Sequence, residues 1–551
     1  MRRKKIRVIL YVLAGLVILL IAVGILVHTI LPQYVHKRLQ QELVQALEQQ
    51  HPGLYQVELE GVRFSPLLRR MKVASLKIEH DSLQLADTTP ESLPRQIFRL
   101  EASDMVISTN GIIDVVREKS DIVFSLVGLQ ELSVFWISNP DGAIMEDNDQ
   151  EEPSWSPQSV HILSLELGFS RMENLMLADT ATKVMSMGSG KLTGNIKYHL
   201  DAGESDPPIS ILEHTLQVAN IAWQPPGDLY RYSCDSLAMA GAGQSIELFG
   251  IRMKPLYDKL TFHNHISFQT DRMDVRVGKA SLSGFDLERL ANQEYFFAEK
   301  LDLSDANMEV FRDRTPPLDE ESRPSLPSRL INEAPLQIFL GSVVIAGLDL
   351  IYQELPEDAT EAGEVPFIDL SASIGNITNV PEMLQQDSIM LIEARANLFG
   401  SPELHATFHY NLMDINGGYN AQGTLEPMSF ELINQAIYPL AGVRIDGGNH
   451  QHTQFYFSGN DFHSTGVLTM RYSGLDLNLQ PERSELRQSI INWAGRNLVY
   501  HEDNPQKDEE PREGEMDFER NPTRFVFHYW WNTFLTGVRS TIFRDVADEM
   551  I

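Results

Sequence analysis

Residues 403–410 read ELHATFHY and residues 419–425 read YNAQGTL. Within each stretch apolar and polar side chains alternate, which is the period of two expected of a half-buried β-strand. Gly417 and Gly418 lie between the two stretches and suit a turn. The pair therefore predicts an antiparallel hairpin with one polar and one apolar face. The apolar set consists of Leu404, Phe408, Tyr410, Tyr419 and Leu425.

The same alternation extends outward in both directions along the chain. It begins at residues 55–60 (YQVELE) and recurs in roughly twenty segments separated by few short helices, which favours a mainly β chain. The interruptions at 141–158 and 354–366 are acidic, and 312–329 carries four prolines. Because flexible Gly/Ser linkers are missing from these places, we expect one continuous, twisted antiparallel sheet. A further strand is predicted over 260–268, with one side formed by Leu260, Phe262, Ile266 and Phe268.

Alternation leaves open what covers the apolar face of this sheet. If the two walls of a curved sheet stay apart, the apolar side chains line an open groove. If the walls meet, the same side chains form an ordinary core. Alternation predicts a one-sided sheet in both cases.

The N-terminal segment predicts a membrane anchor. Residues 8–27 (VILYVLAGLVILLIAVGILV) carry no charge, and a helix of that length covers about 30 Å, the thickness of a bilayer's hydrocarbon core. We assign 8–30 to a transmembrane helix and 1–7 to a basic tail that stays in the cytoplasm. A cleaved signal peptide would have a shorter apolar run and a small-residue cleavage site. A buried core helix would seldom be uncharged on every face.

Four segments follow the predicted anchor. Residues 31–53 form a juxtamembrane amphipathic helix with Leu39, Leu43 and Leu47 on one stripe, which packs on the next domain or lies on the membrane. Residues 54–500 form the large β domain, 501–523 a charged loop and 524–551 an aromatic amphipathic segment. Short helices are predicted at 110–119, 427–440 and 486–499.

The last segment concentrates aromatic side chains. Trp and Tyr favour the membrane–water interface, so this segment either contacts a membrane or a partner, or caps the end of the sheet. The candidate contact residues are Phe527, Tyr529, Trp530, Trp531 and Phe534.

Composition limits the function classes. The chain has 551 residues, 43% hydrophobic and 22% charged, and a net charge of −31. This acidic balance speaks against binding nucleic acid or anionic headgroups through a basic surface. The only cysteine, Cys234, excludes an intramolecular disulfide and a cysteine metal cluster. Together these features favour a bacterial envelope protein.

No motif predicts chemistry. The pairs His263 with His265 and His450 with His452 lack a carboxylate at ligand spacing, so we expect no metal. Neither a G-x-S-x-G elbow nor a phosphate-binding G-x-x-x-x-G-K-[ST] occurs. We therefore expect no catalytic residue and no cofactor.

The order of parts resembles the AsmA-like family of envelope proteins, in the form common in Bacteroidetes. The resemblance covers most of the chain in outline, and its motifs are structural. They include YQVELEGVRFSP (55–66), DRMDVRVGKASLSGFDLERL (271–290), PMSFELINQAIYPLAGVRIDGG (427–448), QFYFSGNDFHSTGVLTMRYSGLDLNL (454–479) and FHYWWNTFLTGVR (527–539).

The resemblance implies a hydrophobic β-groove anchored in the inner membrane, with its bulk in the periplasm. It also implies a non-enzymatic part in phospholipid transfer or outer-membrane maintenance. The expected partners are the inner membrane, phospholipid and other envelope proteins. The alternative is a structural or assembly factor for outer-membrane proteins, with a closed apolar core. An envelope hydrolase would need a nucleophile–base pair, and none is recognisable.

Overall fold

The computed structural model describes part of the chain. The described residues are 37, 40–41, 43–45, 47, 53–65, 69–81, 89–109, 122–142, 159–177, 183–199, 209–241, 244–292, 294–357, 359–479 and 500–543. The predicted helices at 8–30, 110–119 and 486–499 lie outside these residues. Among the residues that are described, no helix has the length and apolar character needed to cross a bilayer.

The described chain is mainly β, with a long mixed sheet and few short helices. Its contacts divide it into two compact units, and the predicted 54–500 domain is split between them. Unit 1 comprises residues 1–248 and 291–293, and unit 2 comprises 249–290 and 294–551.

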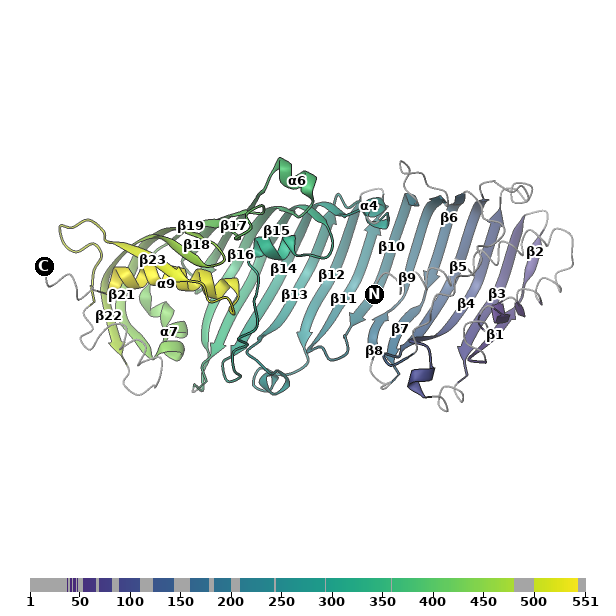
Figure 1. Cartoon of the computed structure of the whole chain (residues 1–551), viewed down its shortest axis with the longest axis horizontal. Coiled ribbons are helices and arrows are strands. Elements are labelled where there is room, and N and C mark those ends of the chain that lie inside the picture. Colours follow the sequence, from purple (N-terminus) through teal and green to yellow (C-terminus); the bar gives the residue numbers. More distant parts are fainter. Residues whose placement is uncertain are drawn as a thin grey trace. The chain divides into compact units, whose positions relative to one another are not determined.

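Unit 1 is a sheet of neighbouring strands (Figure 1). Its strands are β1 (Tyr55–Glu60), β2 (Arg63–Ser65), β3 (Arg70–His80), β4 (Gln96–Thr109), β5 (Ile122–Ser138), β6 (Ser159–Phe169), β7 (Arg171–Met176), β8 (Lys183–Met187), β9 (Gly190–His199), β10 (Ile209–Trp223) and β11 (Tyr230–Ala240), with the 3₁₀ turn η2 (Pro90–Ser92). Strand β5 pairs in parallel with β6 and β7, whereas its partner β4 is antiparallel.

The core of unit 1 follows the predicted alternation. Tyr55, Val57 and Leu59 of β1 are buried while the residues between them are exposed. Described helical residues of the predicted 31–53 segment pack on this core through Leu43. The amide of Gln40 donates to the carbonyl of Val57 at 3.0 Å. This part of the segment therefore packs against the sheet.

Unit 2 holds the remaining strands and most of the helices. Its elements are β12 (Ser245–Pro255, which begins in unit 1), η4 (Phe262–His265), β13 (Asp271–Ser283), α4 (Leu287–Ala291), β14 (Phe296–Asp313), α5 (Pro327–Asn332), β15 (Ile338–Leu355), β16 (Gly363–Thr378), α6 (Pro381–Gln386), β17 (Ile389–Leu398), β18 (Glu403–Asn411), β19 (Tyr419–Leu425), β20 (Met428–Ser429), η5 (Phe430–Ile433), α7 (Asn434–Ala441), β21 (Val443–Gly459), β22 (His463–Leu479), β23 (Glu513–Glu519) and α9 (Val526–Ile542). The hairpin predicted over 403–425 is β18–β19, with Phe408 opposite Ala421 and Tyr410 opposite Tyr419.

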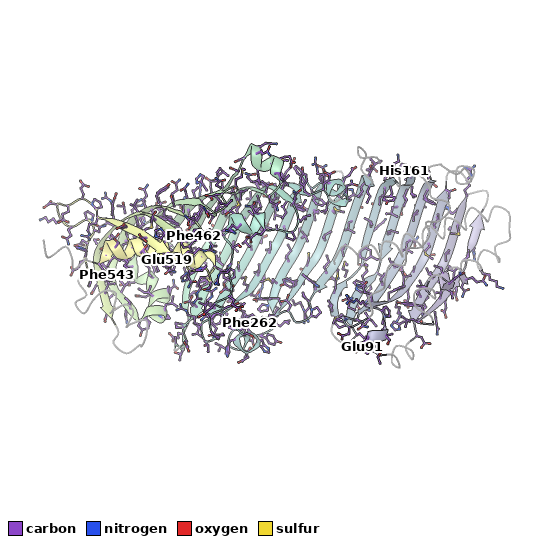
Figure 2. All side chains as sticks on the ribbon, in the orientation of Figure 1. Glu91, His161, Phe262, Phe462, Glu519 and Phe543 are labelled. Carbon is purple, nitrogen blue, oxygen red and sulfur yellow. The ribbon has the colours of Figure 1, made fainter. Side chains whose placement is uncertain are left out.

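Three sequence predictions need correction. The sheet is mixed rather than antiparallel. In unit 2, β14 and β15 pair in parallel over their whole length. In unit 1, β5 pairs in parallel first with β6 and then with β7. Residues 260–268 contain no strand; they form a loop that includes η4 and Phe262 (Figure 2). Phe262 is buried, whereas Leu260 and Phe268 are exposed. The predicted charged loop 501–523 contains β23, which pairs with β22.

Helix α9 packs on β22 and β23 (Figure 1). Its buried face repeats every four residues as Tyr529, Thr533, Gly537 and Thr541. The hydroxyls of both threonines donate to carbonyls one turn earlier, so their burial leaves no donor unpaired. A Cβ on Gly537 would lie 2.6 Å from Met516 Cγ, so the helix lies very close to the sheet.

The substitution Gly514→Ala tests this close approach. A Cβ at Gly514 in β23 would overlap the carbonyl oxygen of Gly537, which is backbone and cannot rotate away. We expect the variant to lose about 1–3 kcal/mol of stability, the usual cost of overpacking. Urea unfolding of the full chain in a neutral detergent, followed by tryptophan fluorescence, measures the loss. The control Gly375→Ala meets no atom within 4 Å; equal stability of the two variants would contradict the packing described.

We expect His450 to make the stability of unit 2 depend on pH. Its ring is 2% exposed and lies 2.7 Å from the hydroxyl of Thr453. Burial lowers the pKa of His450 to about 4, and the hydrogen bond with the Glu426 carbonyl opposes this shift. The unfolded chain takes up this proton near pH 6.5 and the folded chain only near pH 4, so stability is full above pH 6.5 and falls as pH drops through that window.

We expect His450 alone to cost the protein about 2 kcal/mol between pH 7.5 and pH 5. Urea unfolding at both pH values measures it, and His450→Gln should remove that part of the loss. The exposed His409 on β18 provides the control His409→Gln. If the His450 variant keeps the pH dependence of the unsubstituted chain, the assignment is wrong.

Candidate functional site

The register of unit 2 places apolar side chains on one face of the sheet, called here the apolar face. Residues opposite each other in a ladder project to the same side. One row runs through Leu282, Leu301, Val343, Ile374, Ile392 and Phe408 on six successive strands. The next row runs through Ala280, Leu303, Ile345, Ala372, Ala394 and Ala406.

In four neighbouring strands the alternation of side chains between the two faces is interrupted by one additional residue, at the same level of the sheet. The interruption falls at Gly278 in β13, Asp305 in β14, Gly347 in β15 and Asp369 in β16. The last three have positive φ values of 54°, 69° and 53°. Because the strands shift together, the apolar side chains beyond this level return to the same face. Those side chains include Val277, Ala306, Leu348 and Phe367.

Burial along the apolar face is uneven. Leu301, Leu303 and Ile345 in the middle strands are apolar yet only half-buried. In unit 1 the same holds for Leu216 of β10 and its partner Met239 of β11. These side chains therefore keep part of their surface exposed among the described residues, although none of them is fully exposed.

At the other end of unit 2, helix α9 covers the apolar face. Tyr529 is 1% exposed and its ring lies 6.2 Å from that of Tyr419. The Trp530 ring lies 4.4 Å from Phe408. Beneath the helix, β18, β19, β21 and β22 therefore have a closed core.

The predicted groove residues fall into two groups. Tyr410, Tyr419 and Leu425 are buried in or beside this core, and Leu404 and Phe408 are half-buried at its margin. The second group lies in the η4 loop and not on the sheet, and consists of Leu260, Phe262, Ile266 and Phe268. There His265 stacks on Tyr257 at 3.4 Å between ring centroids, and His263 is 3.0 Å from Asp313.

The predicted contact residues of α9 lie on different sides of the helix. Tyr529 faces the sheet, and Phe534 packs on Phe455 at 5.4 Å between ring centroids. Trp530 is half-buried, as described above. Phe527 and Trp531 are 61% and 43% exposed, so only these two are open to an external contact.

A crossover passes over the apolar face, because β14 and β15 run in parallel and the chain must return to the starting end of the sheet. Residues 314–337 make this connection. Leu326 in its middle is fully buried in the core that contains Tyr410 and Tyr419, and Asn332 donates to the carbonyl of Leu412 at 2.8 Å. The crossover therefore covers part of the apolar face.

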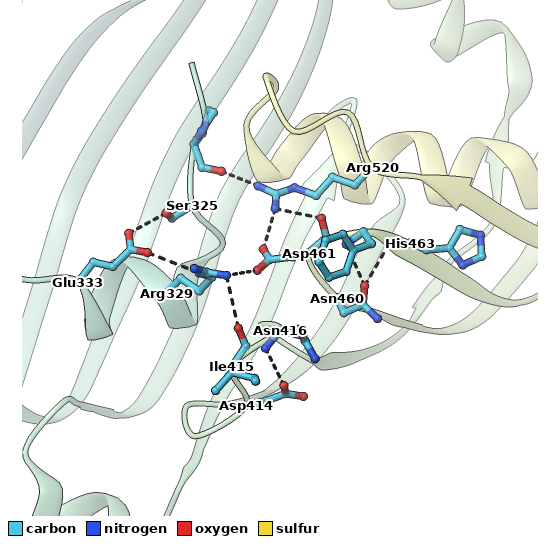
Figure 3. Close-up of polar contacts among 12 residues, drawn as sticks. Ser325, Arg329, Glu333, Asp414, Ile415, Asn416, Asn460, Asp461, His463 and Arg520 are labelled. Atoms are coloured by element: carbon cyan, nitrogen blue, oxygen red, sulfur yellow. Dashed lines mark hydrogen bonds and ion pairs between the residues drawn. The ribbon is translucent and has the colours of Figure 1, made fainter. Parts of the chain in front are cut away.

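Asp461 binds two arginines that hold the crossover in place (Figure 3). One of its oxygens accepts from Arg520 at 2.7 Å and the other from Arg329 of α5 at 2.5 Å. Arg520 also donates to the carbonyl of Pro324. Two cations on one 10%-exposed carboxylate link the crossover, the β21–β22 turn and the end of β23.

Polar side chains gather on the apolar face near the ends of β13–β15, which the sequence patterns did not indicate. Arg312 forms a bidentate pair with Asp271, with both N–O distances 2.7 Å. The hydroxyl of Tyr352 donates to Glu354 at 2.8 Å. Burial, together with Arg524 and Arg312, lowers the pKa of His528 to about 4. Charged and polar side chains therefore lie at this end of the face beside the apolar rows.

The described residues hold no group of three or more His, Cys, Asp or Glu side chains arranged to bind a metal. Cys234 is buried and its thiol donates to the carbonyl of Ser236 at 3.1 Å.

Comparison with protein-family models gives no match for this chain, and comparison with curated proteins gives none either. The resemblance to the AsmA-like family therefore depends on the motifs quoted above.

Proposed function

We propose that this chain is a membrane-anchored periplasmic protein that binds lipid acyl chains on its apolar face and contributes to phospholipid transfer or outer-membrane maintenance. The observation that carries the proposal is the set of half-buried apolar side chains in the middle strands, such as Leu303 and Ile345. An ordinary core would bury them. An acyl chain on the face would complete their burial.

The physics of lipid movement gives such a face its use. Each methylene moved from an apolar environment into water costs about 0.8 kcal/mol. An acyl chain therefore leaves a bilayer only for another apolar surface. A sheet supplies that surface along its whole width, because each added strand extends the rows by about 4.8 Å. No bond is made or broken, so no catalytic residue is needed.

The alternative, a structural or assembly factor with a closed core, has support in one place. Beneath α9 the apolar face is fully covered, with Tyr410, Leu468 and Met516 at 0% exposure. A core of this kind serves stability and not transport. We assign the lipid contact to the middle strands, where the apolar side chains are half-buried, and the structural role to the region beneath α9.

Photo-crosslinking from neighbouring residues on opposite faces tests the proposal. A benzophenone amino acid is placed in the full chain at Leu303 or Leu216, which belong to the half-buried apolar sets. The matched controls are Asp302 and Gln217, because successive residues of a strand face opposite sides. We expect lipid adducts, identified by mass spectrometry after irradiation of membranes, from the leucine positions and not from the controls. Adducts at equal yield from both faces, or from neither while lipid is absent from the purified chain, would rule the proposal out.

A further inference from the structure

Three arginines of unit 2 come together near the ends of β13–β15, on the apolar face. Arg312 lies near the end of β14 and is paired with Asp271. Arg314 follows that strand, and its Nε lies 3.2 Å from Glu354 of β15. Each of these two cations therefore has a carboxylate of its own.

The third arginine, Arg524, precedes helix α9. It donates to the side-chain oxygen of Gln269 at 2.9 Å, and Gln269 donates to the carbonyl of Arg314 at 3.1 Å. This bridge holds Arg524 next to Arg314. Among the described residues no carboxylate lies within ion-pair distance of Arg524. Burial is the main cause that lowers the pKa of Arg524; Arg312 and Arg314 lower it further, and the carboxylate of Glu354 opposes them.

The charges at this place do not balance. Three guanidinium groups face the carboxylates of Asp271 and Glu354, which leaves one positive charge. The whole chain carries a net charge of −31, so the local sign is opposite to that of the protein. A neutral hydrogen-bond donor could also hold Gln269, so this contact alone does not require a cation. A partly buried cation without a counter-ion lowers the stability of the protein unless an anion binds to it.

The arginines adjoin the apolar rows. Tyr352 of β15 donates to Glu354. Leu350 lies two residues before Tyr352 on the same strand and is opposite Met308 of β14. That step is about 7 Å. Both side chains are half-buried. A molecule with an anionic group at the arginines could therefore lay an apolar tail on these side chains.

We propose that Arg524, Arg314 and Arg312 form a seat for a phosphate group, and that this phosphate is the headgroup of an anionic lipid whose acyl chains lie on the apolar face beside Met308 and Leu350. The assignment rests on the proposed function and adds the class of lipid. Guanidinium groups suit phosphate because their N–H donors bind its oxygens in pairs. The acidic remainder of the chain offers such a group few other places to bind.

Binding of matched fluorescent probes to the full chain in a neutral maltoside detergent tests the seat. The probes are labelled phosphatidylglycerol and labelled diacylglycerol, which have the same acyl chains and differ by the phosphate headgroup. We expect Arg524→Gln to weaken phosphatidylglycerol binding about tenfold, the effect of losing one charge-assisted contact. Diacylglycerol binding should change less than about twofold, because it offers that contact no anion.

Two further variants separate binding from folding. Arg524→Lys retains the charge and should keep phosphatidylglycerol affinity nearer to that of the unsubstituted chain than Arg524→Gln does. Arg276 on β13 projects from the opposite face and is 67% exposed, so Arg276→Gln should change neither probe. If Arg524→Gln weakens both probes equally and also lowers the melting temperature, Arg524 is a structural residue and the seat is refuted.

The remaining outcomes distinguish the seat from the face. If both probes bind equally well and Arg524→Gln affects neither, the apolar face binds lipid but the arginines do not select it. If neither probe binds, the proposed function itself fails. If millimolar inorganic phosphate displaces labelled phosphatidylglycerol completely, the seat serves free phosphate and the lipid assignment is overturned.

Discussion

Two residues that oppose each other in a β-ladder project their side chains to the same side of the sheet, and every apolar surface described above depends on this constraint. It carries the row that begins at Leu282 across six strands to Phe408 without a break. A single extra residue in one strand would reverse the faces beyond it. Unit 2 avoids this because β13, β14, β15 and β16 shift at the same level. Asp305 and Asp369 accept positive φ values there, a conformation that aspartate tolerates better than most residues.

The parallel pairing of β14 and β15 has a second consequence. A parallel neighbour forces the chain to recross the sheet, so residues 314–337 must lie over one face. The chain buries Leu326 of this crossover in the core and holds the segment with Asp461, Arg329 and Arg520. The apolar face is thereby divided into a covered part and a half-buried part. A purely antiparallel sheet would need no such crossover.

Much of this fold can be predicted from local patterns, and the failures have physical reasons. For the hairpin 403–425 the sequence predicts both the pairing and the side chains on each face correctly, because its alternation is undisturbed. Strand β23 was missed because EGEMDFE reads as an acidic loop, although Gly514, Met516 and Phe518 alternate with carboxylates. Residues 260–268 alternate except at Asn264, which falls on the otherwise apolar side, and they form a loop. A side-chain period does not reveal whether a neighbouring strand is present to accept the backbone hydrogen bonds. The parallel pairs and the arginine cluster depend on contacts between residues far apart in the sequence, which a single sequence does not contain.

The distribution of charged groups on the apolar face follows from the free-energy cost of burying an unpaired charge. Away from water, a charge is tolerated only when it is paired, and Arg312 with Asp271 meets that requirement, as does Arg520 with Asp461. Arg524 is only partly buried, and among the described residues its printed partner is the neutral Gln269 and not a carboxylate. Its excess charge and the adjoining half-buried rows are both incomplete in the protein alone, one lacking an anion and the other lacking apolar cover. An amphiphile with an acidic headgroup supplies both at once, which is why the two features are better explained together than separately.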